Sequence, residues 1–173
     1  ADMYFYAVET LEEYGYVQYE ISNFCLPGME SRHNLKYWTG QPYIGFGPAA
    51  ASDFGGKRFT MCRDLQGYIQ GIRKKGQVIV DLQEIPMRER AGEYLMLRLR
   101  LAKGIDTADF RARFGADFDE IFGKKLEIYV KNGLMTHENG HYAFTPQGMF
   151  VSNEILSRII PFETKYEKGG KNS

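Results

Sequence analysis

The chain has 173 residues, of which 43% are hydrophobic and 25% charged, a balance that supports a folded core in one large domain or two small ones. Its 22 basic and 22 acidic residues give a formal net charge of zero, which excludes the global positive field behind nonspecific nucleic-acid binding. It has neither an apolar run long enough to span a bilayer nor a signal-peptide pattern at the N-terminus, so we expect a cytoplasmic protein.

The first part of the chain alternates helical and strand periodicity. In chain order, the pattern predicts a helix over residues 4–14, strands over 17–21, 43–52 and 57–63, and a helix from an Asp64 cap to Lys74. This alternation favours an α/β architecture with parallel strands. A parallel sheet of only two or three strands has too few neighbouring elements to cover both of its faces. We therefore expect a further part of the protein to complete the sheet.

The second part is predicted to be mostly helical. The order is a helix over residues 88–103, short and longer helices over 107–114 and 118–133, a hairpin turning at Asn139-Gly140, and a helix from Thr145-Pro146 to Ile160. The first of these helices is apolar on several sides, so we expect it to lie between the two halves. Helices followed by a hairpin and a helix give a winged-helix-like outline.

Residues 21–40, ISNFCLPGMESRHNLKYWTG, place His33 beside Asn34, Tyr37 and Trp38. A histidine on such a segment is most often a hydrogen-bonded structural residue. The alternative is a haem ligand, because an imidazole can bind haem iron while neighbouring aromatic rings supply apolar surface. On this second interpretation, the Asn34 side chain is predicted to fix the local turn.

Other candidate features have weaker signals. Glycines in GFGPAAAS, residues 45–52, allow a ligand to approach the backbone, but close strand packing explains them equally well. The lysines of the 118–133 helix share it with acidic residues, which favours a solvated face over a DNA-binding one. Cys25 and Cys62 form no CxxC pair and are expected to be reduced thiols.

Three motifs in order, YEISNFCLPG, RHNLKYW and GFGPAAAS, resemble the C-terminal part of the radical S-adenosylmethionine family of oxygen-independent coproporphyrinogen III oxidases. Within that family they are similar to the HemW-like haem chaperones, whose HNxxYW pattern differs from the corresponding sequence of the oxidases. The segment EYLMLRLRLAKGID, residues 93–106, resembles the start of the family's C-terminal domain. Ala49, Ala51 and Cys25 depart from the family's usual Gly, His and Ala.

The resemblance implies a fold and a function. Residues 1–75 are expected to be the C-terminal part of a partial TIM-like radical SAM barrel, residues 76–162 a HemN-type C-terminal domain, and residues 163–173 a disordered tail. Haem is expected to bind at His33, which ligates its iron, with Asn34, Tyr37 and Trp38 around it. The expected partners are haem-acceptor proteins, peripheral membrane proteins among the candidates, and not nucleic acid.

The resemblance also implies S-adenosylmethionine and a [4Fe-4S] cluster in the full-length parent, with Cys25 and Met96 approaching the S-adenosylmethionine. The CxxxCxxC motif that holds the cluster does not occur in this chain, so we expect it upstream and expect the isolated chain to be inactive. Two alternatives remain: a fragment of a coproporphyrinogen III oxidase and a winged-helix nucleic-acid-binding module. The HNxxYW motif argues against the first and the balanced charge against the second.

Overall fold

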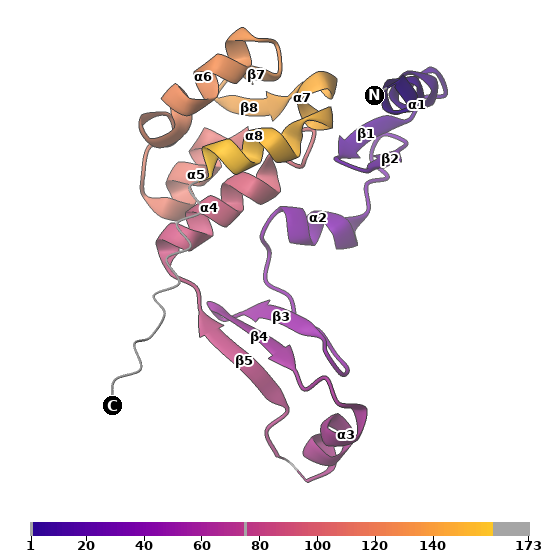
Figure 1. The fold of residues 1–173 in the computed structure, drawn as a ribbon, viewed down its shortest axis with the longest axis vertical. Coiled ribbons are helices and arrows are strands. Elements are labelled where there is room, and N and C mark those ends of the chain that lie inside the picture. Colours follow the sequence, from indigo (N-terminus) through magenta and orange to yellow (C-terminus); the bar gives the residue numbers. More distant parts are fainter. Residues whose placement is uncertain (1, 75, 161–173) are drawn as a thin grey trace, which may run out of the picture.

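The computed structural model describes residues 2–74 and 76–160, which form a mixed α/β structure (Figure 1). Its elements are α1 (Asp2–Glu13), β1 (Val17–Glu20), β2 (Asn23–Cys25), α2 (Arg32–Trp38), β3 (Ala51–Phe54), β4 (Lys57–Met61), α3 (Leu65–Arg73), β5 (Ile79–Glu84), α4 (Met87–Arg98), β6 (Ile105–Asp106), α5 (Thr107–Phe114), a π-helical turn η1 (Asp119–Gly123), α6 (Lys124–Lys131), β7 (Met135–Glu138), β8 (His141–Phe144), α7 (Pro146–Phe150) and α8 (Ser152–Ile159). The predicted disordered tail, residues 163–173, lies outside the described residues.

The N-terminal helix and strand are confirmed as α1 and β1, separated by Gly15 with a φ of 81°. A second short strand, β2, pairs antiparallel with β1. Tyr4 and Phe5 of α1 each lie 5.5 Å from the Phe150 ring of α7, measured between ring centroids. The N-terminal helix therefore packs against α7 of the C-terminal part.

Strands β3, β4 and β5 form a separate sheet in that order, which extends away from the C-terminal helices with α3 at its far end (Figure 1). The prediction of parallel strands is wrong, because every strand pair in the described residues is antiparallel. Between β3 and β4, Gly55 and Gly56 have φ values of 60° and 77°. Two such residues in a two-residue loop reverse the chain directly and so make neighbouring strands antiparallel.

The strand predicted over residues 43–52 is mostly absent. Tyr43 forms only an isolated bridge to Asp53, and β3 begins at Ala51. The backbone between them leaves the extended region at Gly47, with a φ of 107°, and at Ala49, with a φ of 61°. Ala49 thus occupies a left-handed conformation that favours glycine.

The helix predicted over residues 88–103 ends at Arg98 as α4. Beyond it the backbone pairs with the N-terminal hairpin: the Ile21 N–H donates to the Arg100 carbonyl at 2.8 Å, and the Ala102 N–H donates to the Tyr19 carbonyl at 3.1 Å. The apolar run could have continued as a helix, but residues 99–103 form turns around an isolated bridge between Leu101 and Glu20. The tertiary structure therefore overrides the helical pattern.

The remaining local predictions largely hold. Asp64 caps α3, the 107–114 helix is confirmed as α5, and Thr145 caps α7 by accepting a hydrogen bond from the Gly148 N–H at 3.2 Å. The hairpin turn is confirmed, with Asn139 and Gly140 at φ values of 51° and 76°. The last predicted helix is broken into α7 and α8, since Val151 departs from helical dihedrals with φ −103° and ψ 14°.

The main core lies in the C-terminal part, between α4, α5, α6, α8 and the sheet β6–β8–β7. Its centre is made of side chains with almost no exposure: Leu95, Leu99, Ile105, Phe110, Phe118, Leu126 and Ile159. Burial of this many large apolar side chains is the main source of stability for such a domain. Across residues 2–74 and 76–160, no helix has both the length and the apolar character needed to cross a membrane.

Candidate functional site

Helix α2 carries all four residues of the predicted haem site and lies between the N-terminal hairpin and the β3–β5 sheet (Figure 1). Its first turn is capped by Ser31, whose hydroxyl accepts a hydrogen bond from the Asn34 N–H at 3.3 Å. The Asn34 side chain does not fix this turn, contrary to the prediction. Instead its amide donates to the Tyr19 hydroxyl at 3.4 Å, which holds α2 against β1.

The four residues occupy two neighbouring faces of α2. His33 and Tyr37, four residues apart, meet edge to face with ring centroids 5.0 Å apart, and Tyr37 meets Tyr43 in the same way at 4.7 Å. On the adjoining face, the guanidinium of Arg100 lies 5.8 Å from the Trp38 ring centroid. The structure therefore gathers His33 with aromatic rings, as expected, but directs the Asn34 amide to β1.

His33 differs from the other two histidines in its contacts. It is exposed, and within the described part of the chain its ring nitrogens take part in no hydrogen bond or ion pair. His137 instead stacks on Tyr142 at 3.9 Å, and His141 Nδ1 lies 3.2 Å from the Asn139 carbonyl oxygen. His33 therefore has ring nitrogens available for an external ligand, as does His137, whose ring is stacked on Tyr142.

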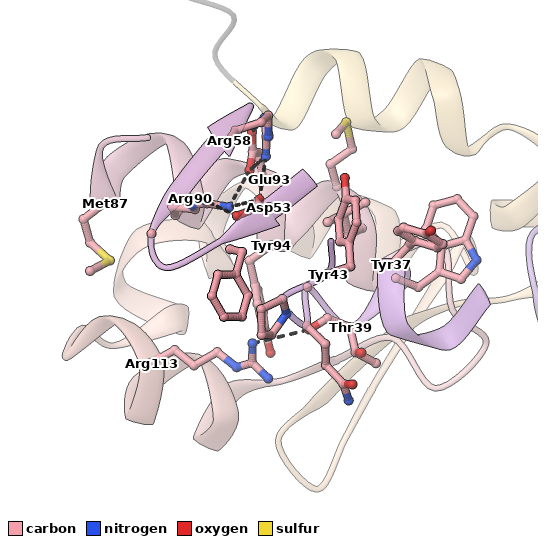
Figure 2. A pocket seen from close by; sticks show the side chains of 18 of the residues that line it. Tyr37, Thr39, Tyr43, Asp53, Arg58, Met87, Arg90, Glu93, Tyr94 and Arg113 are labelled. Atoms are coloured by element: carbon pink, nitrogen blue, oxygen red, sulfur yellow. Dashed lines mark hydrogen bonds and ion pairs between the residues drawn. The ribbon is translucent and has the colours of Figure 1, made fainter. Parts of the chain in front are cut away.

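A cavity of about 550 Å³ lies beside α2, enclosed by β3, β4, α4 and α5 (Figure 2). Its lining includes aromatic and thioether side chains, among them Tyr37, Trp38, Tyr43, Tyr94 and Met96, together with charged residues. This volume and lining are typical of small-molecule sites. His33 does not line the cavity, but its contact partner Tyr37 does.

Four charged residues form one wall of this cavity and join the β3–β4 hairpin to α4 (Figure 2). Arg58 donates to both carboxylate oxygens of Glu93, at 2.8 and 2.9 Å, and to Asp53 Oδ2 at 3.2 Å. Arg90 binds both oxygens of Asp53, with Nη2 to Oδ1 at 2.8 Å. Two guanidinium and two carboxylate groups make this charge cluster neutral.

The charge cluster shifts the pKa values of its members. The hydrogen bond from Arg90 holds the pKa of the Asp53 carboxyl below its ordinary value, against an opposing effect of burial. The pKa values of Arg58 and Arg90 are raised by Glu93 and Asp53, respectively. Burial, followed by the charge of Asp53, raises the pKa of the neighbouring Tyr43 hydroxyl.

We expect Asp53→Asn to lower the free energy of unfolding by about 1–3 kcal/mol at pH 7, because it removes the carboxylate that Arg90 binds through two nitrogens and leaves only the longer contact to Glu93. Since the folded-state pKa of Asp53 is depressed, its contribution is present above the unfolded pKa and is lost as the pH falls through the folded value. Urea denaturation between pH 7 and pH 2 should therefore show a smaller acid-dependent loss in the variant.

The control for this measurement is Glu127→Gln, which breaks the exposed Glu127–Lys131 pair. An exposed i,i+4 pair contributes little, so this variant should change stability by less than about 0.5 kcal/mol. Equal effects of the two substitutions would show that the charge cluster does not hold the hairpin to α4.

A second polar group lies at the opposite side of the cavity and centres on Asp109. Its carboxylate accepts hydrogen bonds from Tyr94 Oη at 2.7 Å, Arg98 Nη2 at 3.0 Å and Arg113 Nε at 2.9 Å. Arg113 also donates to the carbonyl of Thr39, the C-cap of α2, at 3.3 Å (Figure 2). This contact ties the end of α2 to α5.

The two residues predicted to approach S-adenosylmethionine, Cys25 and Met96, lie in different surroundings. Met96 lines the cavity with Tyr37, while Cys25 is buried in β2 opposite Val17 and is not among the described lining residues. Burial, with a smaller effect of Glu30, raises the pKa of the Cys25 thiol. Within the described residues no group of three His, Cys, Asp or Glu side chains could hold a metal ion, so the ligands of an iron–sulfur cluster are not found there.

Sequence analysis missed the two polar groups around the cavity. The DFGGKR segment, residues 53–58, carries a readable hairpin signal that places Asp53 directly opposite Arg58. The spacing of Arg90 and Glu93 likewise puts both on one side of α4. No local pattern brings Arg113 to Thr39, because that contact joins residues 74 positions apart.

Comparisons with known proteins agree with this fold. The family described as the HemN C-terminal domain matches residues 85–151. The chain is 34% identical to a protein named heme chaperone HemW from Bacillus subtilis over 92% of this chain and 42% of the relative. A heme chaperone HemW from Synechocystis is also 34% identical, over 92% of this chain and 43% of the relative. The chain thus spans less than half the length of these relatives.

Among solved structures, the Escherichia coli coproporphyrinogen III oxidase HemN, titled a radical SAM enzyme, matches 90% of this chain and 39% of its own with a TM-score of 0.68. At 15% sequence identity this likeness concerns the fold alone. The matched domain and these relatives define the class: the chain belongs to the HemN-like family. Within that family, it corresponds to the C-terminal portion of the HemW-like haem chaperones.

Proposed function

We propose that this chain is the haem-handling portion of a radical SAM family chaperone, which binds haem through His33 and passes it to acceptor proteins. The observation that carries the proposal is the exposed His33 imidazole, with no hydrogen-bond partner among the described residues and an aromatic ring beside it. The HemW relatives supply the independent support that haem is the ligand class.

The residues around His33 fit haem as cargo. A neutral imidazole nitrogen is an ordinary axial ligand of haem iron, and apolar ring surface stabilises a flat porphyrin. Tyr37 offers such a surface next to the imidazole, and Trp38 adds a second on the adjoining face. An exposed position also suits transfer, because an acceptor protein has to reach the bound haem.

The proposal extends to the parts of the chain and to the full-length parent. We place residues 1–75 in the last part of a radical SAM barrel and residues 76–162 in a winged-helix-like C-terminal domain. The pairing of β5 with β4 and the family match from residue 85 favour moving the division to the end of β5. S-adenosylmethionine, approached by Cys25 and Met96, and a [4Fe-4S] cluster belong to the parent, which we expect to act in the cytoplasm.

The proposal predicts that the chain binds about one haem per molecule and releases it to an apoprotein. A visible titration with haemin should give a shifted Soret band that saturates at that ratio. Addition of excess apomyoglobin should then convert the spectrum to that of myoglobin, at a rate different from that of free haemin. A spectrum unchanged from that of free haemin throughout the titration would refute haem binding, and a haem complex inert to apomyoglobin would refute delivery.

Neither alternative gains a specific observation. The likeness to the oxidase HemN extends to the fold and not to its reaction. On α6, the presumed DNA-facing helix of a winged-helix module, Lys131 is paired with Glu127 at 2.5 Å and Lys125 lies 3.5 Å from the Ile159 carbonyl oxygen. These lysines are therefore partly neutralised or engaged within the fold, which disfavours phosphate binding.

A further inference from the structure

One guanidinium at the edge of the aromatic cavity is only partly used by the fold. Asp109 faces two guanidinium groups, Arg98 and Arg113, so this group carries one positive charge in excess. Arg113 directs Nε to Asp109 and Nη1 to the Thr39 carbonyl, while its Nη2 has no hydrogen-bond partner among the described residues. By contrast, the cluster of Asp53, Arg58, Arg90 and Glu93 is neutral and internally paired.

The position of Arg113 relative to His33 follows from the geometry of α2. Arg113 is bonded to the Thr39 carbonyl, at the C-terminal end of the helix that bears His33 near its start. Thr39 lies six positions after His33, which corresponds to about 9 Å along a helix axis. Between the two lies Tyr37, which contacts His33 and also lines the cavity. A flat ligand that starts at His33 and crosses Tyr37 reaches the cavity edge where Arg113 lies.

We propose that Arg113 binds a carboxylate of the haem ligated by His33, so that the site recognises a propionate side chain as well as the iron. This inference rests on the proposed function. A guanidinium binds a carboxylate through two parallel hydrogen bonds, and such charge-assisted pairs are stronger than neutral ones. The ligand class is therefore a flat aromatic macrocycle with carboxylate side chains. The surplus positive charge disfavours macrocycles that lack these carboxylates.

Arg113→Gln tests this assignment with three ligands that differ in one group each. Haemin has iron and free propionates, metal-free protoporphyrin IX keeps only the propionates, and haem dimethyl ester keeps only the iron. We expect the substitution to weaken the binding of haemin and of protoporphyrin IX by about tenfold, and to leave the affinity for the ester unchanged. Arg113→Lys should recover part of the loss, because it retains the charge without the bidentate geometry.

The matched control is Arg111→Gln on the same helix. Arg111 is paired with Asp117 and its side chain is 67% exposed, and it does not belong to the described lining of the cavity. We expect this variant to bind all three ligands as the unsubstituted chain does. Circular dichroism of both variants verifies that α5 is intact.

The outcomes separate this inference from the proposed function. If the unsubstituted chain binds haemin through His33 while Arg113→Gln leaves its affinity unchanged, Arg113 is not a propionate partner and the proposed function stands. An equal loss for haemin and the dimethyl ester also overturns the inference, since it indicates that Arg113 acts only by holding Thr39. If the unsubstituted chain binds none of the three ligands, both proposals fail.

Discussion

His33→Ala is expected to abolish the Soret shift that haemin produces with the unsubstituted chain, or to weaken binding by more than about tenfold, since loss of a metal ligand exceeds the cost of losing its supporting contacts. The substitution removes the nitrogen that would ligate the iron and leaves the Tyr37 surface in place. His33 is exposed and outside the core, so the fold should not change. Circular dichroism and urea denaturation provide that check.

The other two histidines supply the matched controls. His137→Ala and His141→Ala remove imidazoles on the β7–β8 hairpin that already contact Tyr142 and the Asn139 carbonyl. Both variants should bind haemin with the affinity of the unsubstituted chain. The assignment is wrong if His33→Ala keeps the shifted Soret band while a hairpin substitution removes it.

Phe110→Ala should lower the free energy of unfolding by about 3–5 kcal/mol, the usual cost of removing a fully buried aromatic ring. Phe110 has no exposed surface and is surrounded by four other rings, with centroid distances of 5.6 Å to Tyr94, 4.8 Å to Phe114, 5.2 Å to Phe118 and 6.0 Å to Phe122. Its removal leaves a cavity that these rings cannot all collapse to fill. Urea denaturation followed by circular dichroism measures the loss.

Phe46→Ala is the matched control, because Phe46 is 86% exposed and its truncation forms no internal cavity. Its effect on stability should stay within about 0.5 kcal/mol. A small effect at Phe110 would mean that the C-terminal core is loosely packed. Phe110 shares α5 with Arg113 and packs against Tyr94 of α4, so its loss should also weaken haem binding in a way that Phe46→Ala does not.

Local sequence determined most of the C-terminal half. A strong cap, a helical stripe or a two-residue turn signal depends only on neighbouring residues, so the helix at 107–114 and the Asn139-Gly140 hairpin follow directly. The HNLKYW motif indicated a candidate imidazole, on a segment that the structure shows to be α2. In these places local propensity and tertiary packing favour the same structure.

Only the tertiary structure decided where α4 ends and how the cavity is built. Helical periodicity continues beyond Arg98, but residues 100 and 102 form hydrogen bonds with Ile21 and Tyr19 and the chain continues there as turns. The contact of Arg113 with Thr39 and the bonds that join Asp53 to Arg90 bridge 74 and 37 positions of the chain. Such pairings depend on how separate elements pack, and no short-range pattern records them. The sequence therefore indicated the candidate imidazole of His33, while only the tertiary structure brought the charged groups together around the cavity.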